Sequence, residues 1–244
     1  MKEVRIGCAG WVYPDWRGVL YPDGMPQREW LSAYAREFDT VEINNTFYRL
    51  PSAAAVKGWA DETPADFCFA VKASRYITHV KRLLKPEKYV ERFLASLDPL
   101  RESGKLGVVL WQLPPNFKRD DDRLAGALAA IGARAPGRHC FEFRDPSWFT
   151  SDVYDLLRSH EAALVISDDP GLAFQSRVLT TSWTYVRMHR GGRGRRGNYS
   201  AAELETWRRR IASWRSRSEV FVYFNNDREA FAVRNARRLA AGLS

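Results

Sequence analysis

Two polar side chains with chemical potential stand inside one apolar run near residue 42. In the segment TVEINNTFYRLP at residues 40–51, apolar side chains alternate with Glu42 and Asn44, so these two polar groups share one side of an expected strand. A buried, unpaired carboxylate costs on the order of several kcal/mol, so an inward Glu needs a partner or a function. This placement predicts part of a functional site.

The same alternation puts further polar groups at the ends of other apolar runs. The candidates for catalysis are Glu42, Asn44, Lys72, Glu142, Arg144, Asp168 and His189. The carboxylates and the imidazole could serve as general acid, general base or metal ligand. Lys72 could form a Schiff base if its neighbours desolvate it, although pairing with a carboxylate is the preferred interpretation.

Two alternatives to acid–base chemistry are open at this stage. The acids, the imidazole and the amides could hold a divalent cation, but the sequence has no HExxH or other compact metal signature, so no cofactor is identified. The polar groups could also form a satisfied salt-bridge network that only fills the barrel. Such a network would pair Glu42 with Lys72 and Glu142 with Arg187.

A second set of residues could bind a ligand beside the catalytic candidates. Tryptophans that follow strands could form an aromatic wall, and the glycine- and arginine-rich loop RGGRGRRGN at residues 190–198 could bind phosphate before a helix that begins near Ser200. A mobile, unliganded loop is the alternative interpretation. The expected ligand-binding residues are Trp11, Gln112, Trp148, Arg187, Arg190, Arg193, Tyr199, Asn225 and Asn226.

Positive charge is concentrated in one part of the chain. The net charge is +9, and residues 187–217 hold ten arginines against two acids. This segment could contact phosphate on a small anionic ligand or on a nucleic acid, or it could be a solvated helix face next to a loop.

Short apolar, β-branched or aromatic runs recur along the whole chain. They cover residues 4–8, 40–43, 68–71, 106–110, 140–143, 163–166, 183–188 and 220–224. Segments of helical character lie between most of them, at residues 26–38, 53–62, 86–103, 121–134, 151–160, 201–213 and 228–239. We expect an α/β fold, a single (β/α)8 TIM barrel over residues 1–244, with a degenerate helix between the sixth and seventh strands.

Composition limits where the protein works. Cys8, Cys68 and Cys140 lie far apart in or beside apolar runs, which predicts reduced core thiols. There is no leader-like segment and no apolar stretch long enough for a membrane span. We expect a soluble, cytoplasmic protein with no membrane partner, and its oligomeric state stays open.

With these residues identified, the chain closely resembles the YecE-like family, also known as domain of unknown function 72. The matching motifs are Gly10-Trp11 with Trp16 and Tyr21-Pro22, Thr40-Val-Glu-Ile-Asn44 with Thr46-Phe-Tyr48 and Pro51, Phe69 with Lys72, Thr78-His79, Gln112-Leu-Pro-Pro115, Glu142-Phe-Arg144 with Trp148, Arg187-Met-His189 and Tyr223-Phe-Asn-Asn226. The resemblance implies a TIM barrel but no reaction. Its fold is similar to sugar-isomerase and apurinic-endonuclease barrels, which suggests nucleic-acid processing by analogy alone. The chain departs from the family at Arg190, where a glycine is usual.

Three hypotheses follow from the sequence. The first is an enzyme that acts on a phosphate-bearing or sugar-like ligand at the barrel mouth by acid–base or metal-assisted chemistry, as a hydrolase, isomerase or lyase. The second is a nucleic-acid-binding or nucleic-acid-processing protein that uses the arginines of residues 187–217. The third is a ligand sensor without catalysis.

Overall fold

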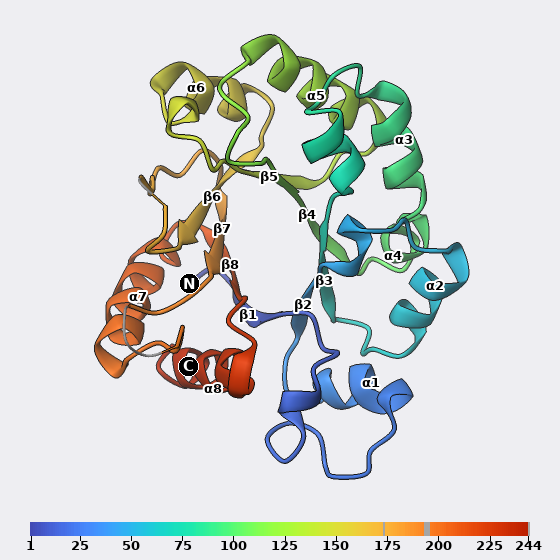
Figure 1. The fold of residues 1–244 in the computed structure, drawn as a ribbon, viewed down its shortest axis with the longest axis vertical. Coiled ribbons are helices and arrows are strands. Elements are labelled where there is room, and N and C mark those ends of the chain that lie inside the picture. Colours follow the sequence, from blue (N-terminus) through green and yellow to red (C-terminus); the bar gives the residue numbers. More distant parts are fainter. Residues whose placement is uncertain (173, 193–195, 244) are drawn as a thin grey trace.

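The chain folds into a closed barrel of eight parallel strands, as the sequence predicted. The computed structural model describes residues 1–172, 174–192 and 196–243. Strands neighbour one another in chain order, and the eighth pairs with the first to close the ring (Figure 1). The strands are β1 (Val4–Ala9), β2 (Thr40–Ile43), β3 (Cys68–Lys72), β4 (Leu106–Gln112), β5 (Arg138–Glu142), β6 (Ala163–Asp168), β7 (Trp183–Met188) and β8 (Glu219–Phe224).

Helices surround the barrel and cover its outer face (Figure 1). They are α1 (Trp30–Tyr34), α2 (Ala53–Asp61), α3 (Glu87–Ala95), α4 (Asp98–Glu102), α5 (Asp121–Arg134), α6 (Ser151–Ser159), α7 (Ala201–Trp214) and α8 (Phe231–Ala241). None of the helices within the described ranges is long and apolar enough to cross a membrane.

Three connections differ in detail from the expected helices. The segment 26–38 forms only the short helices η2 (Gln27–Glu29) and α1, and the segment 86–103 is divided into α3 and α4. Between β6 and β7 the described residues contain no helix at all. Pro170 and Gly171 start this connection, and both residue types interrupt helices.

Local capping accounts for two helix starts. Ser52 accepts a hydrogen bond from the backbone nitrogen of Ala55, and Ser200 forms a capping box with Glu203. For α5 the cap is Asp120, one residue before the acids that we expected to open this helix.

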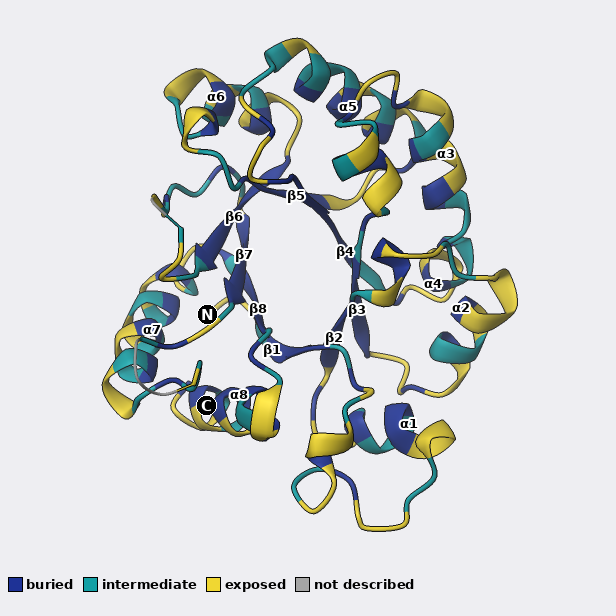
Figure 2. Cartoon of the chain, viewed as in Figure 1, coloured by how far each residue is buried: buried dark blue, intermediate teal, exposed yellow. Residues whose placement is uncertain are grey.

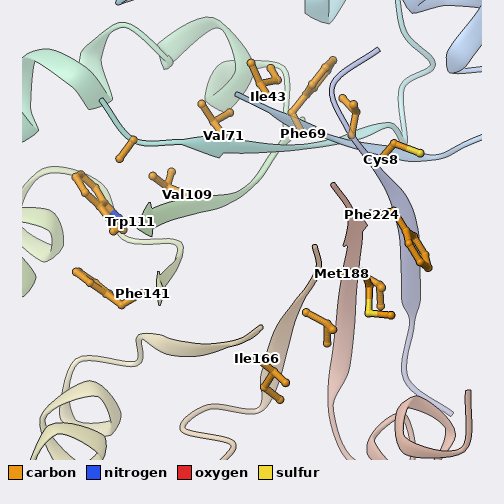
Figure 3. Packing of buried hydrophobic residues seen from close by; sticks show 14 of the residues in the cluster. Cys8, Ile43, Phe69, Val71, Val109, Trp111, Phe141, Ile166, Met188 and Phe224 are labelled. Carbon is orange, nitrogen blue, oxygen red and sulfur yellow. The ribbon is translucent and has the colours of Figure 1, made fainter. Parts of the chain in front are cut away.

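Most strand residues are buried, and the partly or fully exposed ones lie at strand ends, as at Arg138 of β5 (Figure 2). The outward faces pack against the helices, and Figure 3 shows part of this layer. The inward faces form a second cluster inside the barrel, made of Cys68, Ala70, Val108, Leu110, Cys140, Ala163, Val165, Trp183, Tyr185, Phe221 and Tyr223. The polar site lies on this inward side.

The three cysteines are free and buried, as expected for core thiols. Cys8 lies in the outer layer, whereas Cys68 and Cys140 lie inside the barrel. Burial raises the pKa of Cys68 to about 11, so this thiol stays protonated and unreactive at neutral pH.

The first two strands approach closely at Gly7, which gives a test of the barrel geometry. A Cβ atom at Gly7 would lie 2.2 Å from the backbone oxygen of Thr40, whereas one at Gly126 in α5 would meet nothing within 4 Å. We expect Gly7→Ala to lower the free energy of unfolding by about 2 kcal/mol or more through overpacking. Gly126→Ala should raise it by up to about 1 kcal/mol through helix propensity. Urea unfolding followed by tryptophan fluorescence measures both, and a Gly7→Ala protein as stable as the wild type would contradict the close approach.

Candidate active site

Arg187 of β7 joins two glutamates from other strands in the centre of the barrel. Its Nε and Nη2 donate to the two carboxylate oxygens of Glu42 at 2.9 and 2.7 Å, and its Nη1 donates to Oε2 of Glu142 at 2.7 Å. The side chains of all three residues are at most 1% exposed. The hydroxyl of Tyr185 donates to Glu42 at 2.7 Å. This arrangement links β2, β5 and β7.

The three buried charges hold one another in the ionised state. Burial is the largest single influence and raises the pKa of both glutamates. Arg187 with Tyr185 and Lys72 outweighs it at Glu42, whose pKa is below its usual value. Arg187 with Arg144 and His189 outweighs it at Glu142, whose pKa is well below its usual value. Burial lowers the pKa of Arg187, yet the two carboxylates raise it above its ordinary value. Both glutamates therefore stay carboxylates at neutral pH.

The second carboxylate oxygen of Glu142 accepts hydrogen bonds from three further side chains. Oε1 accepts from Nη2 of Arg144 at 2.7 Å, from Oγ of Ser167 at 3.0 Å and from Nε2 of His189 at 3.1 Å. Nδ1 of His189 lies 3.2 Å from Nδ2 of Asn225. A proton on Nε2 donates to Glu142 and leaves Nδ1 to accept from Asn225. Nη2 of Arg144 lies 3.1 Å from the same Nε2 and, with that proton present, donates to Glu142 and not to the ring.

Lys72 ends β3 on the inward side, but it does not form the ion pair that we expected. Its Nζ lies 4.2 Å from the ring centroid of Phe47. Within the described part of the chain, no carboxylate lies within salt-bridge distance of this amine, because Glu42 is bound by Arg187 instead. Burial, with Arg187 as the next largest cause, lowers the pKa of Lys72 to about 8. The other expected pair, Glu142 with Arg187, is present.

His79 joins Lys72 at the Phe47 ring, and sequence alternation did not place it in the site. It lies on the π-helix η4 (Tyr76–Val80), and its ring meets the Phe47 ring edge-on with 4.9 Å between centroids. Burial, then the charge of Lys72, lowers the pKa of His79 to about 4. The backbone just beyond is strained, since Arg82, Leu83 and Lys85 have positive φ. Only the Thr78-His79 motif of the family resemblance drew attention to this residue.

Three of the expected site residues lie outside the barrel mouth. The carboxylate of Asp168 accepts a hydrogen bond from Nε1 of Trp207 in α7 at 2.7 Å, so it points toward the helices. Tyr199 packs edge-on against Phe224 in the outer layer. Trp148 is fully buried, also in the outer layer. For Asp168 the reason is the two-residue period of β6, which turns Ser167 inward and its neighbour outward.

Asn44 and Gln112 lie at the ends of their strands around the mouth, whereas Trp11 does not. Asn44 precedes the short helix η3 (Asn45–Phe47), and its Oδ1 is buried without a hydrogen-bond partner in the described structure. Gln112 is in register with Glu142 on the neighbouring strand. Trp11 follows β1 and meets Trp59 of α2 edge-on, 6.0 Å between centroids, as part of the outer core.

A cavity of about 660 Å³ opens beside His189, between the connections that follow β6, β7 and β8. Arg190 leans across it to Asp169, with Nε 2.9 Å from Oδ1, and Nδ2 of Asn226 donates to the carbonyl oxygen of Gly197 at 3.0 Å. Arg193 lies outside the described residues. The lining residues are Pro170, Gly171, His189, Arg190, Gly191, Gly192, Arg196, Gly197, Asn225, Asn226, Asp227 and Arg228.

The arginines between residues 187 and 217 do not share one surface. Arg187 is inside the barrel, and Arg208 and Arg209 pair with Glu205 on α7. The carbonyl oxygen of Arg215 accepts a hydrogen bond from the backbone nitrogen of Lys2, beside the start of β1 and so at the barrel end opposite the mouth. The excess charge of this segment is therefore distributed over both ends and the interior.

The residues of the mouth do not fit a metal centre. The described residues contain no group of three or more His, Cys, Asp or Glu side chains arranged to hold a metal ion. All four carboxylate oxygens of Glu42 and Glu142 accept hydrogen bonds from the surrounding arginine, tyrosine, serine and histidine side chains. We therefore derive no step through a metal.

Removing Arg187 tests whether the buried ion pairs hold the site together. We expect Arg187→Met to lower the free energy of unfolding by roughly 3 to 5 kcal/mol, because two carboxylates lose their main partner. Arg138→Met breaks a partly exposed pair with Glu219 and should cost less than about 1 kcal/mol. Urea unfolding compares the two variants.

A triple variant keeps this test informative if Arg187→Met alone does not fold. Adding Glu42→Gln and Glu142→Gln should recover part of the lost stability, because no buried carboxylate is then left without its cation. Equal losses for Arg187→Met and Arg138→Met would contradict the role that we assign to the buried charges.

Sequence and structure comparisons place the chain among known proteins. It is 28% identical over 267 residues to the UPF0759 protein YunF of Bacillus subtilis (strain 168), an alignment that covers 97% of this chain and 93% of YunF. It is 33% identical over 148 residues to the UPF0759 protein YecE of Escherichia coli (strain K12), covering 60% of this chain and 50% of YecE. A crystal structure of a DUF72 family protein from Thermotoga maritima MSB8 superposes with a TM-score of 0.86 at 31% identity and covers 99% of both chains.

More distant structures share the barrel alone. A family 2 AP endonuclease from Brucella melitensis superposes with a TM-score of 0.54 at 10% identity, over 95% of this chain and 96% of its own. The family model described as "Protein of unknown function DUF72" matches residues 5–244. The chain, whose motifs resemble those of the YecE-like proteins, therefore belongs to the DUF72 family.

Proposed function

We propose that this barrel is an enzyme that acts on a small phosphate-bearing or sugar-like ligand by acid–base chemistry at its C-terminal mouth. One observation carries the proposal. The amine of Lys72 lies in the mouth over the ring of Phe47. In the neighbouring ion-pair network, both carboxylates, Glu42 and Glu142, are paired with arginines. An amine held in this way can gain and lose a proton near neutral pH.

The charge of the mouth supports an anionic ligand. Glu42, Glu142 and Asp169 contribute three negative charges, whereas four positive charges come from Arg187, Arg144, Arg190 and the protonated Lys72. Arg144 is partly exposed, and its Nη1 lies 3.7 Å from Asp169, which leaves this nitrogen able to turn toward a ligand. Guanidinium groups bind phosphate oxygens through paired hydrogen bonds.

The cavity beside His189 supports a phosphate group in particular. Three arginines line it, and their present partners are Asp169 for Arg190 and Glu229 for Arg196 and Arg228, which a phosphate would replace. The N–H groups of Gly191 and Gly192 already donate to Gly197 and Glu203. Loops after the seventh and eighth strands of such barrels commonly bind phosphate, because glycine lets backbone N–H groups come close to the oxygens. A ligand with its phosphate in this cavity would extend past His189 toward Lys72.

The two glutamates have a positioning role in this proposal. Their lowered pKa values keep them ionised, so they orient Arg187, Arg144 and His189 and do not exchange protons themselves. Lys72 is then the group that transfers a proton. These roles, with the glutamates positioning other groups and Lys72 transferring a proton, favour an isomerase or lyase over a metal-assisted hydrolase.

The nucleic-acid hypothesis finds less support. It needs the arginines of residues 187–217 on one surface, and their positions inside the barrel, on α7 and at the opposite end separate them. A ligand sensor would bind the same anions as the proposed enzyme, but it would convert none of them.

Binding of a simple anion tests the proposal. We expect inorganic phosphate to bind the wild type saturably at pH 7 and low ionic strength, as measured by isothermal titration calorimetry. Lys72→Met and Arg144→Met should each weaken binding about tenfold or more, because each removes a charge-assisted contact. Lys57→Met, which removes an exposed lysine of α2, is the matched control and should leave the affinity unchanged.

The pH dependence of the same binding tests Lys72 once the contribution of Asp227 is separated. Asp227 lines the cavity beside His189, and burial raises its pKa to about 7, so it gives a step near pH 7 that Lys72→Arg leaves in place. Sulfate stays a dianion between about pH 6 and 10, so only groups of the protein titrate in this range. Lys72 is charged below its pKa of about 8, so sulfate affinity should fall as the pH rises through that value. In Lys72→Arg the cation persists and this step should vanish. A wild type without saturable anion binding, or with the same pH profile as Lys72→Arg, would refute the proposal.

A further inference from the structure

Lys72 forms no ion pair with a carboxylate in the described structure, because the arginines of the same site bind the nearby glutamates. Arg187 binds Glu42 through two nitrogens and Glu142 through a third, and Arg144 binds the other oxygen of Glu142. The amine is left with the face of the Phe47 ring, 4.2 Å from its centroid. An ion-pairing lysine would have been placed against a carboxylate, so this position calls for another explanation.

The surroundings of this amine favour its uncharged form. Burial removes water from it, and the two guanidinium groups repel a third positive charge nearby, which lowers its pKa to about 8. A desolvated lysine next to other cations is an activated nucleophile, since its lone pair is free in a useful fraction of molecules at neutral pH. The side chain is only partly buried, so a ligand can reach it from the mouth.

We propose that Lys72 is a nucleophile that forms an imine with an aldehyde or ketone group of a small phosphorylated ligand. This proposal rests on the proposed function, because the same mouth must bind the ligand. The lone pair of Nζ attacks the carbonyl carbon, and the carbonyl π electrons move to oxygen to give a carbinolamine. The two hydrogens of the neutral amine then leave with that oxygen as one water molecule, and a C=N bond replaces the C=O bond.

The residues around Lys72 suit the binding step before imine formation. Arg144 offers the N–H groups of Nη1 in the mouth, where they would hold the anionic group of the ligand, while its Nη2 and the Nε2 of His189 stay on Glu142. The imine nitrogen, once protonated, withdraws electrons from the next carbon, so the reaction class is proton removal or C–C cleavage beside the carbonyl. His79 packs on the same Phe47 ring, but its pKa of about 4 makes it a weak base at neutral pH, so we assign it no proton transfer.

Reductive trapping tests this proposal on the intact protein. We would incubate the wild type with glycolaldehyde phosphate and sodium cyanoborohydride near pH 7 and map the modified peptides by mass spectrometry. Reduction adds two hydrogens to the imine, so the expected label is the mass of the aldehyde minus one oxygen atom. We expect Lys72 to be labelled at least about tenfold faster than the exposed Lys57, in line with its larger unprotonated fraction at this pH.

Two controls connect the label to the site. Unphosphorylated glycolaldehyde should label Lys72 more slowly than the phosphate ester does, and Arg144→Met should reduce that difference. Lys72→Arg should lose the rapid label, whereas Lys57→Arg should retain it. Because the site is mapped in the wild type, the test does not depend on the folding of any variant.

The outcome also separates this proposal from the one on which it rests. Labelling of Lys72 at the rate of exposed lysines, in a protein that binds inorganic phosphate with the expected dependence on Lys72, would overturn the nucleophile and leave the acid–base enzyme. Absence of phosphate binding together with slow labelling would overturn both.

Discussion

The guanidinium of Arg187, shared between Glu42 and Glu142, is the interaction on which the rest of the site depends. Three charges inside a barrel are tolerated only because each is paired and hydrogen-bonded, and removing one would leave the others uncompensated. The strands that carry them, β2, β5 and β7, are distant in sequence and are brought together by barrel closure. Barrel closure thus lets one side chain, Arg187, hold the two carboxylates of the mouth in place.

Because Arg187 and Arg144 bind the nearby carboxylates, Lys72 lies partly buried with no carboxylate of the described residues within ion-pair distance. A lysine whose pKa is lower in the folded than in the unfolded chain reduces stability below that pKa, here at every pH under about 8, and the loss is recovered as the pH rises toward the ordinary value. A protein that keeps such a residue gives up stability, and active sites are the usual place for this. The strained backbone from Arg82 to Lys85 lies just beyond the same strand.

Much of the fold could be predicted from the sequence, because apolar runs and helix caps are local signals. Alternation correctly turned Glu42, Glu142 and Arg187 inward. The prediction for Asp168 was wrong because it relied on the position of this residue at the end of β6. The two-residue period of the strand turns Ser167 inward and Asp168 outward. The choice of ion-pair partners was also beyond the sequence, since Lys72 and Arg187 carry the same charge and only their geometry decides which one binds Glu42. His79 depends on a π-helix, which has no simple sequence pattern.

The amine of Lys72 lies in the mouth without an ion-pair partner in the described structure, and its pKa lies close to neutral pH. NMR titration of the lysine Nζ signals, with Lys72→Arg used to assign the one from Lys72, measures this directly. The account predicts a Lys72 midpoint near 8, well below those of the other lysines on the surface, and a rise in that midpoint when inorganic phosphate is bound. A Lys72 signal that titrates together with the surface lysines, and does not respond to phosphate, would contradict it.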